Sequence, residues 1–183
     1  TNQTVTAFEA TEEVFHTKVS TGIPYRRGSN GIATITPVGD FRIDIKMPVR
    51  HMGNGILTND ITAYELPGIP WPCYFTRTGV AFHGCYWHDN YGTEMSHGCV
   101  NMRPEEAKWI WRWSTPLITH EDWIKNGNGT RVEVIACGSE EQLEQLLAWL
   151  QQGPEYAVVN AVAVETIDIA SPAYGRALGC DGW

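Results

Sequence analysis

The sequence lacks an excess of basic residues. Thirteen Lys and Arg stand against 21 Asp and Glu, which gives a formal net charge of −8. Nucleic-acid-binding proteins present a basic stripe to the phosphate backbone, and anionic membrane surfaces attract basic segments. The composition therefore predicts no nucleic-acid partner and disfavours attachment to an anionic membrane surface.

Long hydrophobic runs are also missing. No stretch approaches the roughly 18 consecutive apolar residues of a membrane-spanning helix, and no secretory signal opens the chain. Thr1 already stands in a strand-like pattern, so we expect the N-terminal start of the domain to be truncated. A length of 183 residues favours one domain with an appendage.

The number of cysteines is odd. An odd number leaves at least one free thiol if the others pair, as in a protein with one reactive cysteine and structural ones. Spacing does not give the connectivity, and a Cys137–Cys180 disulfide is a hypothesis that would agree with an extracytoplasmic location. The five cysteines are Cys73, Cys85, Cys99, Cys137 and Cys180.

Short strands broken by turns dominate the first 100 residues. The β-rich runs Val5–Ala10 and Val14–Ser20 flank a polar turn and predict a hairpin. Residues Gly39–Met47 alternate around apolar side chains, which predicts one half-buried strand. Two more strands are predicted over Cys73–Phe75 and Gly79–Cys85, and two loops over Arg50–Asp60 and Leu66–Pro72.

Two helices are predicted in the second half of the chain. Pro104, followed by two glutamates, predicts a helix that ends near Trp113. Ser139 and Gln142 form a capping box before a leucine stripe, which predicts a second helix. Strands are further predicted over Arg131–Ala136 and, less regularly, Ala157–Ile169.

The segment from residue 79 to residue 103 concentrates the side chains that can carry chemistry. It holds five within 17 positions: His83, Cys85, His88, His97 and Cys99. A thiolate is the attacking form of cysteine, and a nearby imidazole can take its proton. A glycine before the cysteine lets successive N–H groups face a developing oxyanion. The pattern indicates acyl transfer, and a buried structural cysteine is the alternative.

The same five side chains are also potential zinc ligands. Their spacings, H-x-C-x2-H and H-x-C, differ from the C-x2–4-C pairs of structural zinc sites. No carboxylate completes the set. We therefore predict no metal site and keep a zinc-site protein as an alternative.

Residues 83–101 resemble the signature of the L,D-transpeptidase catalytic domain (YkuD-type) family. A His-Gly pair, a spacer, and Ser-His-Gly-Cys with a following hydrophobic residue and Asn make up that signature. Here these are His83-Gly84 and, after twelve residues from Gly84 to Met95, Ser96-His97-Gly98-Cys99-Val100-Asn101. Ser20-Thr21-Gly22 and the segment Thr36–Ile43 are similar to the family's "STG … TPxGxFxI" pattern.

This resemblance covers about residues 1–137 and implies a fold. We expect a catalytic domain over residues 1–138 and a C-terminal helix and tail over residues 139–183. The implied fold class is mainly β with α, a sandwich-like mixed sheet with one packed helix.

The resemblance also implies the role of each site residue. Cys99 is the expected nucleophile and His83 the expected general base, whose ring the Gly84 carbonyl orients. The N–H groups of Gly98 and Cys99 are expected to form the oxyanion hole, and His97 to fix the loop or contact substrate. Substrate contacts are expected from Tyr64, Trp71, Trp87, Ser96, Asn101 and Arg103. For the aromatic residues among these, packing in the core is an equal alternative. For Arg103, the alternative is that it caps the helix that follows.

The implied activity is peptidoglycan L,D-transpeptidation in the cell wall, outside the cytoplasm. A Cys99 thioester would carry a stem peptide to a second stem and form a 3→3 cross-link, with no cofactor and with carbapenems as inhibitors. An L,D-carboxypeptidase or a related cysteine hydrolase would use the same thioester, so this alternative stays open. A wall-binding module is the non-enzymatic alternative, and the intact signature argues against it.

Cys85 departs from the family pattern, which usually has a small polar residue at this position. Alternation along a strand places Cys85 on the same face as His83. One hypothesis is a buried small side chain or a partner for Cys73. The other is a redox lock, in which Cys85 and Cys99 form a disulfide.

Overall fold

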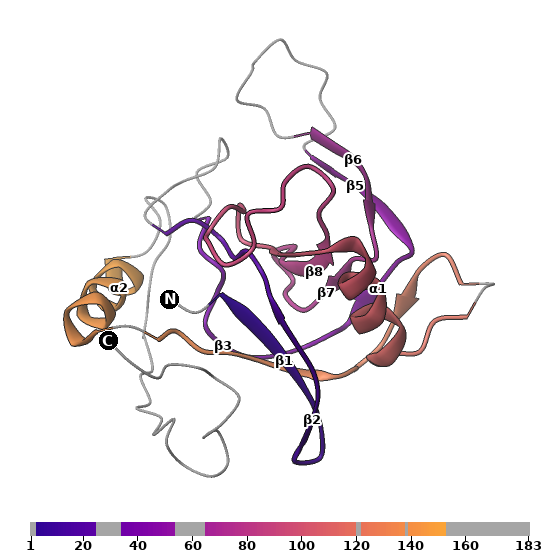
Figure 1. Cartoon of the computed structure of the whole chain (residues 1–183), viewed down its shortest axis with the longest axis horizontal. Coiled ribbons are helices and arrows are strands. Elements are labelled where there is room, and N and C mark those ends of the chain that lie inside the picture. The colour runs from indigo at the N-terminus through magenta and orange to yellow at the C-terminus, as the bar shows by residue number, and fades with distance from the viewer. Residues whose placement is uncertain (1–2, 25–33, 54–64, 120–121, 138, 153–183) are drawn as a thin grey trace.

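The structure is a computed structural model that describes residues 3–24, 34–53, 65–119, 122–137 and 139–152 (Figure 1). Short strands and two helices make up these ranges, which confirms the expected fold class. No helix in these ranges is long and apolar enough to cross a membrane. The elements are β1 (Thr4–Glu9), β2 (Glu12–Lys18), β3 (Gly39–Arg42), β4 (Ile45–Lys46), β5 (Val49–Gly53), β6 (Glu65–Pro70), β7 (Cys73–Tyr74), β8 (Ala81–Gly84), β9 (Val100–Met102), α1 (Pro104–Trp113), β10 (Lys125–Asn126), β11 (Arg131–Val134) and α2 (Glu140–Gln152).

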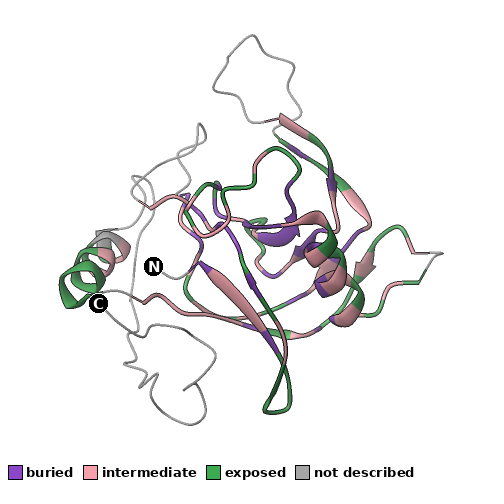
Figure 2. Ribbon diagram, in the orientation of Figure 1, coloured by how far each residue is buried: buried purple, intermediate pink, exposed green. Residues whose placement is uncertain are grey.

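A five-stranded sheet forms the centre, in the order β10-β4-β7-β8-β9. Its last pair, β8 and β9, is parallel, whereas its other pairs are antiparallel. Phe82, Val100 and Met102 join Ala107 and Ile110 of α1 in one buried core. Because side chains alternate along a strand, the residues between them face the other side of the sheet. Figure 2 shows the buried residues gathered around β7 and β8.

The predicted hairpin is confirmed by β1 and β2, which pair in an antiparallel register from Thr4↔Lys18 to Glu9↔Glu12. The hairpin is fixed to α1 by aromatic contacts. The rings of Phe15 and Trp109 stack at 4.4 Å, and Nε1 of Trp113 donates a hydrogen bond of 2.8 Å to Glu9. The predicted first helix is confirmed with its bounds.

The single strand predicted over residues 39–47 is wrong. The chain forms β3 and β4 instead, because the two halves pair with different strands: β3 with β11, and β4 with β7 and β10. The second half also buries Lys46 completely, and its ammonium donates a hydrogen bond of 2.6 Å to the carbonyl of Ser114. Lys46, which the alternation assigned to the solvent side, is thus the buried residue of β4.

The two predicted loops also contain strands. Val49–Gly53 forms β5, and Glu65–Pro70 forms β6 despite its prolines. The β5–β6 ribbon has only two strands, so a proline without an N–H can occupy an unpaired side. The tertiary pairing outweighs the turn-forming residues.

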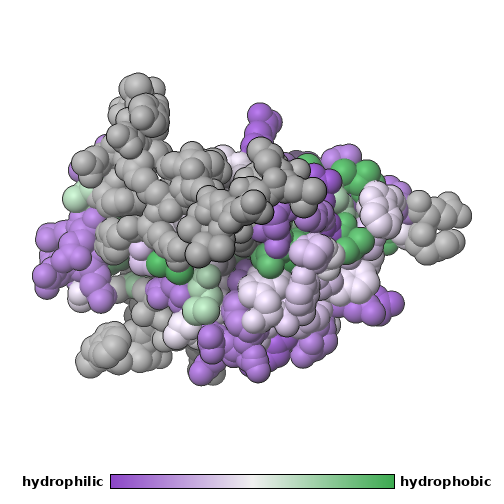
Figure 3. Space-filling model, turned by 90° about the horizontal axis from the view of Figure 1, so that it is seen from above, coloured by the Kyte–Doolittle hydropathy of each residue, from purple (hydrophilic) through white to green (hydrophobic). Residues whose placement is uncertain are grey.

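The second helix, α2, is confirmed together with its capping box. The N–H of Ser139 donates to Oε1 of Gln142 at 3.0 Å, and the N–H of Gln142 donates to Oγ of Ser139 at 3.3 Å. None of the α2 side chains that the structure describes is buried. The left end of the molecule, where α2 lies in Figure 1, is hydrophilic in Figure 3. The strands predicted over residues 157–169 lie outside the described residues.

Candidate active site

A closed loop carries Cys99 immediately before β9. Oγ of Ser96 donates a hydrogen bond of 2.5 Å to the carbonyl of Cys99 and accepts one of 3.0 Å from the N–H of Gly98. Gly98 has a φ of +121°, which a residue with a side chain rarely adopts. The N–H of Gly98 is thus engaged inside the loop, contrary to its expected place in the oxyanion hole, because the small Ser96 side chain folds back onto it.

The Thr-Gly and Thr-Pro segments form the floor of this loop. Oγ1 of Thr36 donates to the carbonyl of Gly98 at 2.8 Å and accepts from the N–H of Gly22 at 2.9 Å. A Cβ atom on Gly22 would lie 1.8 Å from the carbonyl oxygen of Thr34 and 2.9 Å from Cα of Gly98. Only glycine fits here, so these segments hold the cysteine loop by close backbone contact.

His83 lies on β8 and is completely buried. Its Nδ1 is 3.1 Å from the carbonyl oxygen of Gly84. A carbonyl oxygen only accepts, so Nδ1 carries the proton and Nε2 presents a lone pair. Among the described residues Nε2 has no hydrogen-bond partner. The Gly84 carbonyl therefore holds the ring as expected, in the tautomer that a base needs.

The sheet register brings His83 near Cys99. His83 pairs with Asn101 across the parallel strands, and Cys99 stands two residues before Asn101. His83 and Asn101 therefore face the side of the sheet opposite the core, and Cys99 stands in the loop that leads directly into β9. The thiol of Cys99 is half-buried and lies 3.7 Å from the carbonyl oxygen of Gly79.

Burial sets the charge of both groups. It raises the pKa of the Cys99 thiol to about 11, against a smaller lowering by the backbone of Ala81. It lowers the pKa of His83 to about 4, partly offset by the Gly84 carbonyl, while nearby His88 lowers it further. At neutral pH the pair is consequently a neutral thiol beside a neutral imidazole.

The predicted substrate-binding residues divide into two groups. Trp87 stands beside the imidazole of His83, with ring centroids 5.9 Å apart, and is 37% exposed. Trp71 instead packs on Trp111 of α1, with centroids 4.9 Å apart, as the core-packing alternative expected. Arg103 bonds Glu106 at 3.2 Å, so its guanidinium is paired within the region where α1 begins.

The remaining predicted site residues differ in how far they are buried. Asn101 and Ser96 are buried beside the cysteine loop, whereas His97 is exposed. Tyr64 lies outside the described residues. His88 belongs to the chemistry-bearing segment but had no predicted role at the site; its ring nitrogen lies 3.0 Å from the amide of Asn101. Its place one residue after Trp87 in the signature segment was the available signal.

The zinc alternative and the redox lock do not fit this geometry. Within the described part of the chain no three His, Cys, Asp or Glu side chains gather as metal ligands. Cys85 stands four positions beyond Cys99 along the paired strands. At about 3.3 Å per residue, this is about 13 Å, beyond the Cα separation of a disulfide. Cys73 and Cys85 are buried free thiols, as the simpler hypothesis expected.

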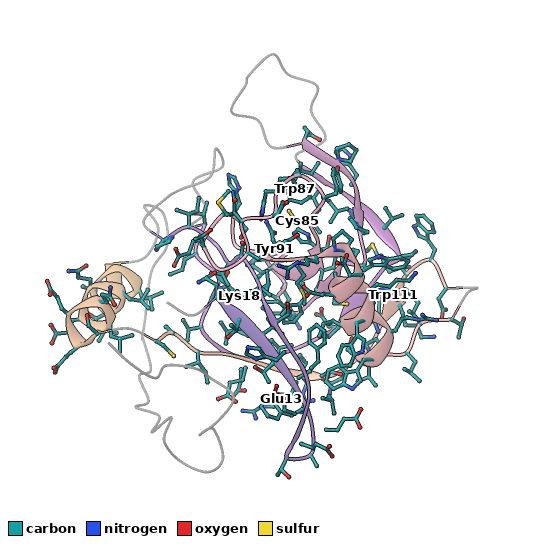
Figure 4. The ribbon with its side chains drawn as sticks, in the orientation of Figure 1. Glu13, Lys18, Cys85, Trp87, Tyr91 and Trp111 are labelled. Atoms are coloured by element: carbon teal, nitrogen blue, oxygen red, sulfur yellow. The ribbon has the colours of Figure 1, made fainter. Side chains whose placement is uncertain are left out.

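Figure 4 shows Cys85, Trp87 and Tyr91 together on the segment that follows β8, whereas Trp111 projects from α1. Tyr91 donates its hydroxyl to the carbonyl of Cys85 at 3.1 Å. Cys137 is disulfide-bonded. Its predicted partner, Cys180, lies outside the described residues, so that pairing stays a prediction.

A sequence model of the L,D-transpeptidase catalytic domain matches residues 1–134. The chain belongs to the L,D-transpeptidase catalytic domain family. Solved members resemble it throughout that region. The L,D-transpeptidase from Mycobacterium smegmatis is 26% identical with a TM-score of 0.58, over 74% of this chain and 55% of that one. An L,D-transpeptidase in complex with imipenem is 25% identical with a TM-score of 0.56, over 73% and 55%.

A second similarity overlaps the end of the first. The acylphosphatase family model matches residues 121–174. The acylphosphatase of Vibrio parahaemolyticus is 44% identical over 45 residues, and that of Halorhodospira halophila 45% over 51 residues. These matches cover 25% and 28% of this chain, and the chain spans 50% and 55% of the two acylphosphatases. The chain thus spans about half the length of the curated relatives it matches.

Proposed function

We propose that this protein is a peptidoglycan L,D-transpeptidase with Cys99 as nucleophile and His83 as general base. The observation that carries the proposal is the buried lone pair on Nε2 of His83. It has no partner within the described residues, and His83 stands on β8, which pairs with the strand that directly follows Cys99. An imidazole held in this tautomer can accept the thiol proton.

The first half-reaction begins from the neutral pair. The Cys99 sulfur bonds to the carbonyl carbon of the third, L-centred diamino residue of a donor tetrapeptide as Nε2 of His83 takes the thiol proton. The N–H of Cys99 is the donor we assign to the oxyanion, because Ser96 already occupies the N–H of Gly98. The C–N bond then breaks, and the terminal D-Ala leaves with the proton from His83.

The second half-reaction transfers the acyl group. A side-chain amine of a second stem attacks the thioester carbon, and His83 takes the proton that the amine loses. The C–S bond breaks, the thiol regains a proton from His83, and a 3→3 cross-link remains. If water replaces the amine, the same steps give a tripeptide.

Two further features belong to this proposal. A carbapenem should acylate Cys99, since a relative 25% identical to this chain is solved in complex with imipenem. We also propose a location outside the cytoplasm, where peptidoglycan lies. We propose no acylphosphatase activity, because the chain spans about half of those enzymes. Part of the matched range, residues 121–174, also pairs with strands of the transpeptidase match: β10 with β4, and β11 with β3.

Mass spectrometry of the products from a disaccharide-tetrapeptide tests the proposal, with Cys99→Ala as the matched control. We expect a cross-linked dimer that has lost one D-Ala, absent with the variant. A tripeptide alone would assign the carboxypeptidase activity instead. No turnover, together with no carbapenem adduct on Cys99, would reject Cys99 as the nucleophile.

A further inference from the structure

The side chain of Asn101 combines deep burial with an incomplete set of hydrogen bonds. The residue is 2% exposed. Its Nδ2 lies 3.0 Å from Nε2 of His88, whereas its Oδ1 is buried with no partner in the described ranges. A buried amide group without a hydrogen-bond partner raises the free energy of the folded protein. A ligand that pairs with this end of the Asn101 side chain would remove that cost.

The hydrogen bond at Nδ1 of His88 decides which of the two ring nitrogens carries the proton. The backbone N–H of Asn90 donates to Nδ1 at 3.3 Å. Since a backbone N–H only donates, Nδ1 must present a lone pair, and the proton of the neutral ring is on Nε2. Burial also lowers the pKa of His88, which favours this neutral ring.

A proton on Nε2 of His88 decides the orientation of the Asn101 amide. With Nδ2 toward His88 two donors would face each other, at 3.0 Å. Half a turn of the amide exchanges its oxygen and nitrogen and restores a donor–acceptor pair. The oxygen then accepts from His88, and the NH2 group takes the buried position that has no partner.

The segment that carries His88 cannot easily turn to avoid this constraint. Oγ of Ser20 donates to the carbonyl of Asn90 at 3.0 Å. Ser20 also exchanges two backbone hydrogen bonds with Asn101, of 2.8 and 2.9 Å. The histidine, its backbone donor and the asparagine are thus held together by one buried serine.

Asn101 faces the reacting groups. It pairs with His83 across the parallel strands and stands two residues after Cys99. An amide donor and the imidazole lone pair of His83 are therefore neighbours, both buried and without a partner among the described residues. A peptide that enters this position can place one carbonyl oxygen against the Asn101 amide donor. Its reacting carbonyl carbon can at the same time meet the Cys99 thiol.

We propose that His88 is a positioning residue that fixes the Asn101 amide with its NH2 group toward the substrate, where it binds a backbone carbonyl oxygen of the donor stem. The proposal rests on the proposed function, since it needs a peptide donor at Cys99. It assigns His88 no contact with the reacting atoms.

The tautomer can be measured without any turnover. Long-range proton–nitrogen NMR correlations on protein with ¹⁵N-labelled histidine distinguish a ring protonated on Nε2 from one protonated on Nδ1, and His88→Gln identifies the signal. We expect the proton of His88 on Nε2 at neutral pH. A proton on Nδ1 would overturn the proposal, whatever the enzyme catalyses.

Two substitutions separate positioning from loop structure. In His88→Gln the side-chain NH2 replaces Nε2 and keeps the donor to Asn101; in His88→Asn the side-chain oxygen replaces Nδ1 and keeps only the Asn90 contact. We expect kcat/KM for the tetrapeptide to fall about tenfold or more in His88→Asn and to stay within about threefold in His88→Gln. Carbapenem acylation, which needs no stem carbonyl, should change little in either.

The possible outcomes are distinct. Equal losses in both variants, or a parallel loss of carbapenem acylation, would mean that His88 serves the loop and overturn the proposal. A wild-type protein that neither cross-links nor trims the tetrapeptide would reject the proposed function instead, and the NMR measurement would still decide the His88 tautomer.

Discussion

The β8–β9 edge and α2 both have clear sequence patterns, but the fold uses them differently. At the edge, His83 and Asn101 are buried, and the segments around Thr21 and Thr36 donate or accept hydrogen bonds with the cysteine loop. Along α2, the described side chains are exposed or half-buried, and Leu143 is 39% exposed. A capping box and a leucine stripe suffice to form a helix, whereas a catalytic site requires several distant segments.

The junction between these regions belongs to both family matches. Residues 121–134 fall within the transpeptidase match and within the acylphosphatase match. In the structure β10 pairs with β4, and β11 pairs with β3 from Arg131↔Arg42 to Val134↔Gly39. These strands therefore complete the transpeptidase fold, and similarity to half of another enzyme does not provide that enzyme's fold.

The largest expected difference between the regions is in catalysis. Cys99→Ala removes the attacking sulfur, so cross-linking should fall by at least about a thousandfold. Cys85→Ala is the matched control, because Cys85 stands four positions away along the strands and should leave the reaction nearly unchanged. Product analysis by mass spectrometry measures both. A comparable loss in the control would mean that the second thiol takes part.

The next effect is on stability. In Gly22→Ala the new methyl would lie 1.8 Å from a backbone oxygen, so we expect a loss of about 3 kcal/mol in the free energy of unfolding. Leu143→Ala on α2 should cost less than about 1 kcal/mol. Urea denaturation followed by tryptophan fluorescence gives both values. Equal losses would show that α2 is as firmly packed as the floor of the site.

The edge should also respond to pH. The folded-state pKa of His83 is about 4 and its ordinary value 6.5, so the unfolded chain binds this proton first as the pH falls. Stability is then complete above about pH 6.5 and decreases by about 2 kcal/mol from pH 7 to pH 5. Denaturation of wild type and His83→Gln at both pH values isolates this contribution. An equal pH dependence in the two proteins would contradict it.

The rate of carbapenem acylation should also depend on the protonation of His83. Carbapenem acylation of Cys99 needs the lone pair of His83, so it should hold down to about pH 5 and decline only as the pH falls through 4. Stopped-flow absorbance measures this rate. A decline centred near pH 6.5 would mean that His83 is more accessible to water than its burial indicates.

The smallest effect is expected from the C-terminal region. A chain that ends before Gly138, with Cys137→Ser, should cross-link within about twofold of the full chain, since the described part of α2 contributes no buried side chain. Mass spectrometry of the products from the disaccharide-tetrapeptide measures the cross-linking activity of both chains. A large loss of activity would show that residues 139–183 support the site, and would reverse the comparison.

Local signals predicted several elements because their physics is local. The β1–β2 hairpin, α1 with its proline start, and the Ser139–Gln142 capping box depend on neighbouring residues and are confirmed. The prediction of one strand over residues 39–47 was wrong because pairing partners from distant segments divide it. Trp71 likewise packs on Trp111, which no local pattern indicates.

By itself the sequence determined the family, the nucleophile and base candidates, and the carbonyl that holds His83, because these depend on residue type and spacing within one short segment. The tertiary structure decided the rest: that Ser96 occupies the N–H of Gly98, that Cys85 is too far from Cys99 to bond it, and that His88 meets Asn101. These depend on strand register and on hydrogen bonds between side chains and backbone. Both arise only when segments far apart in the chain come together.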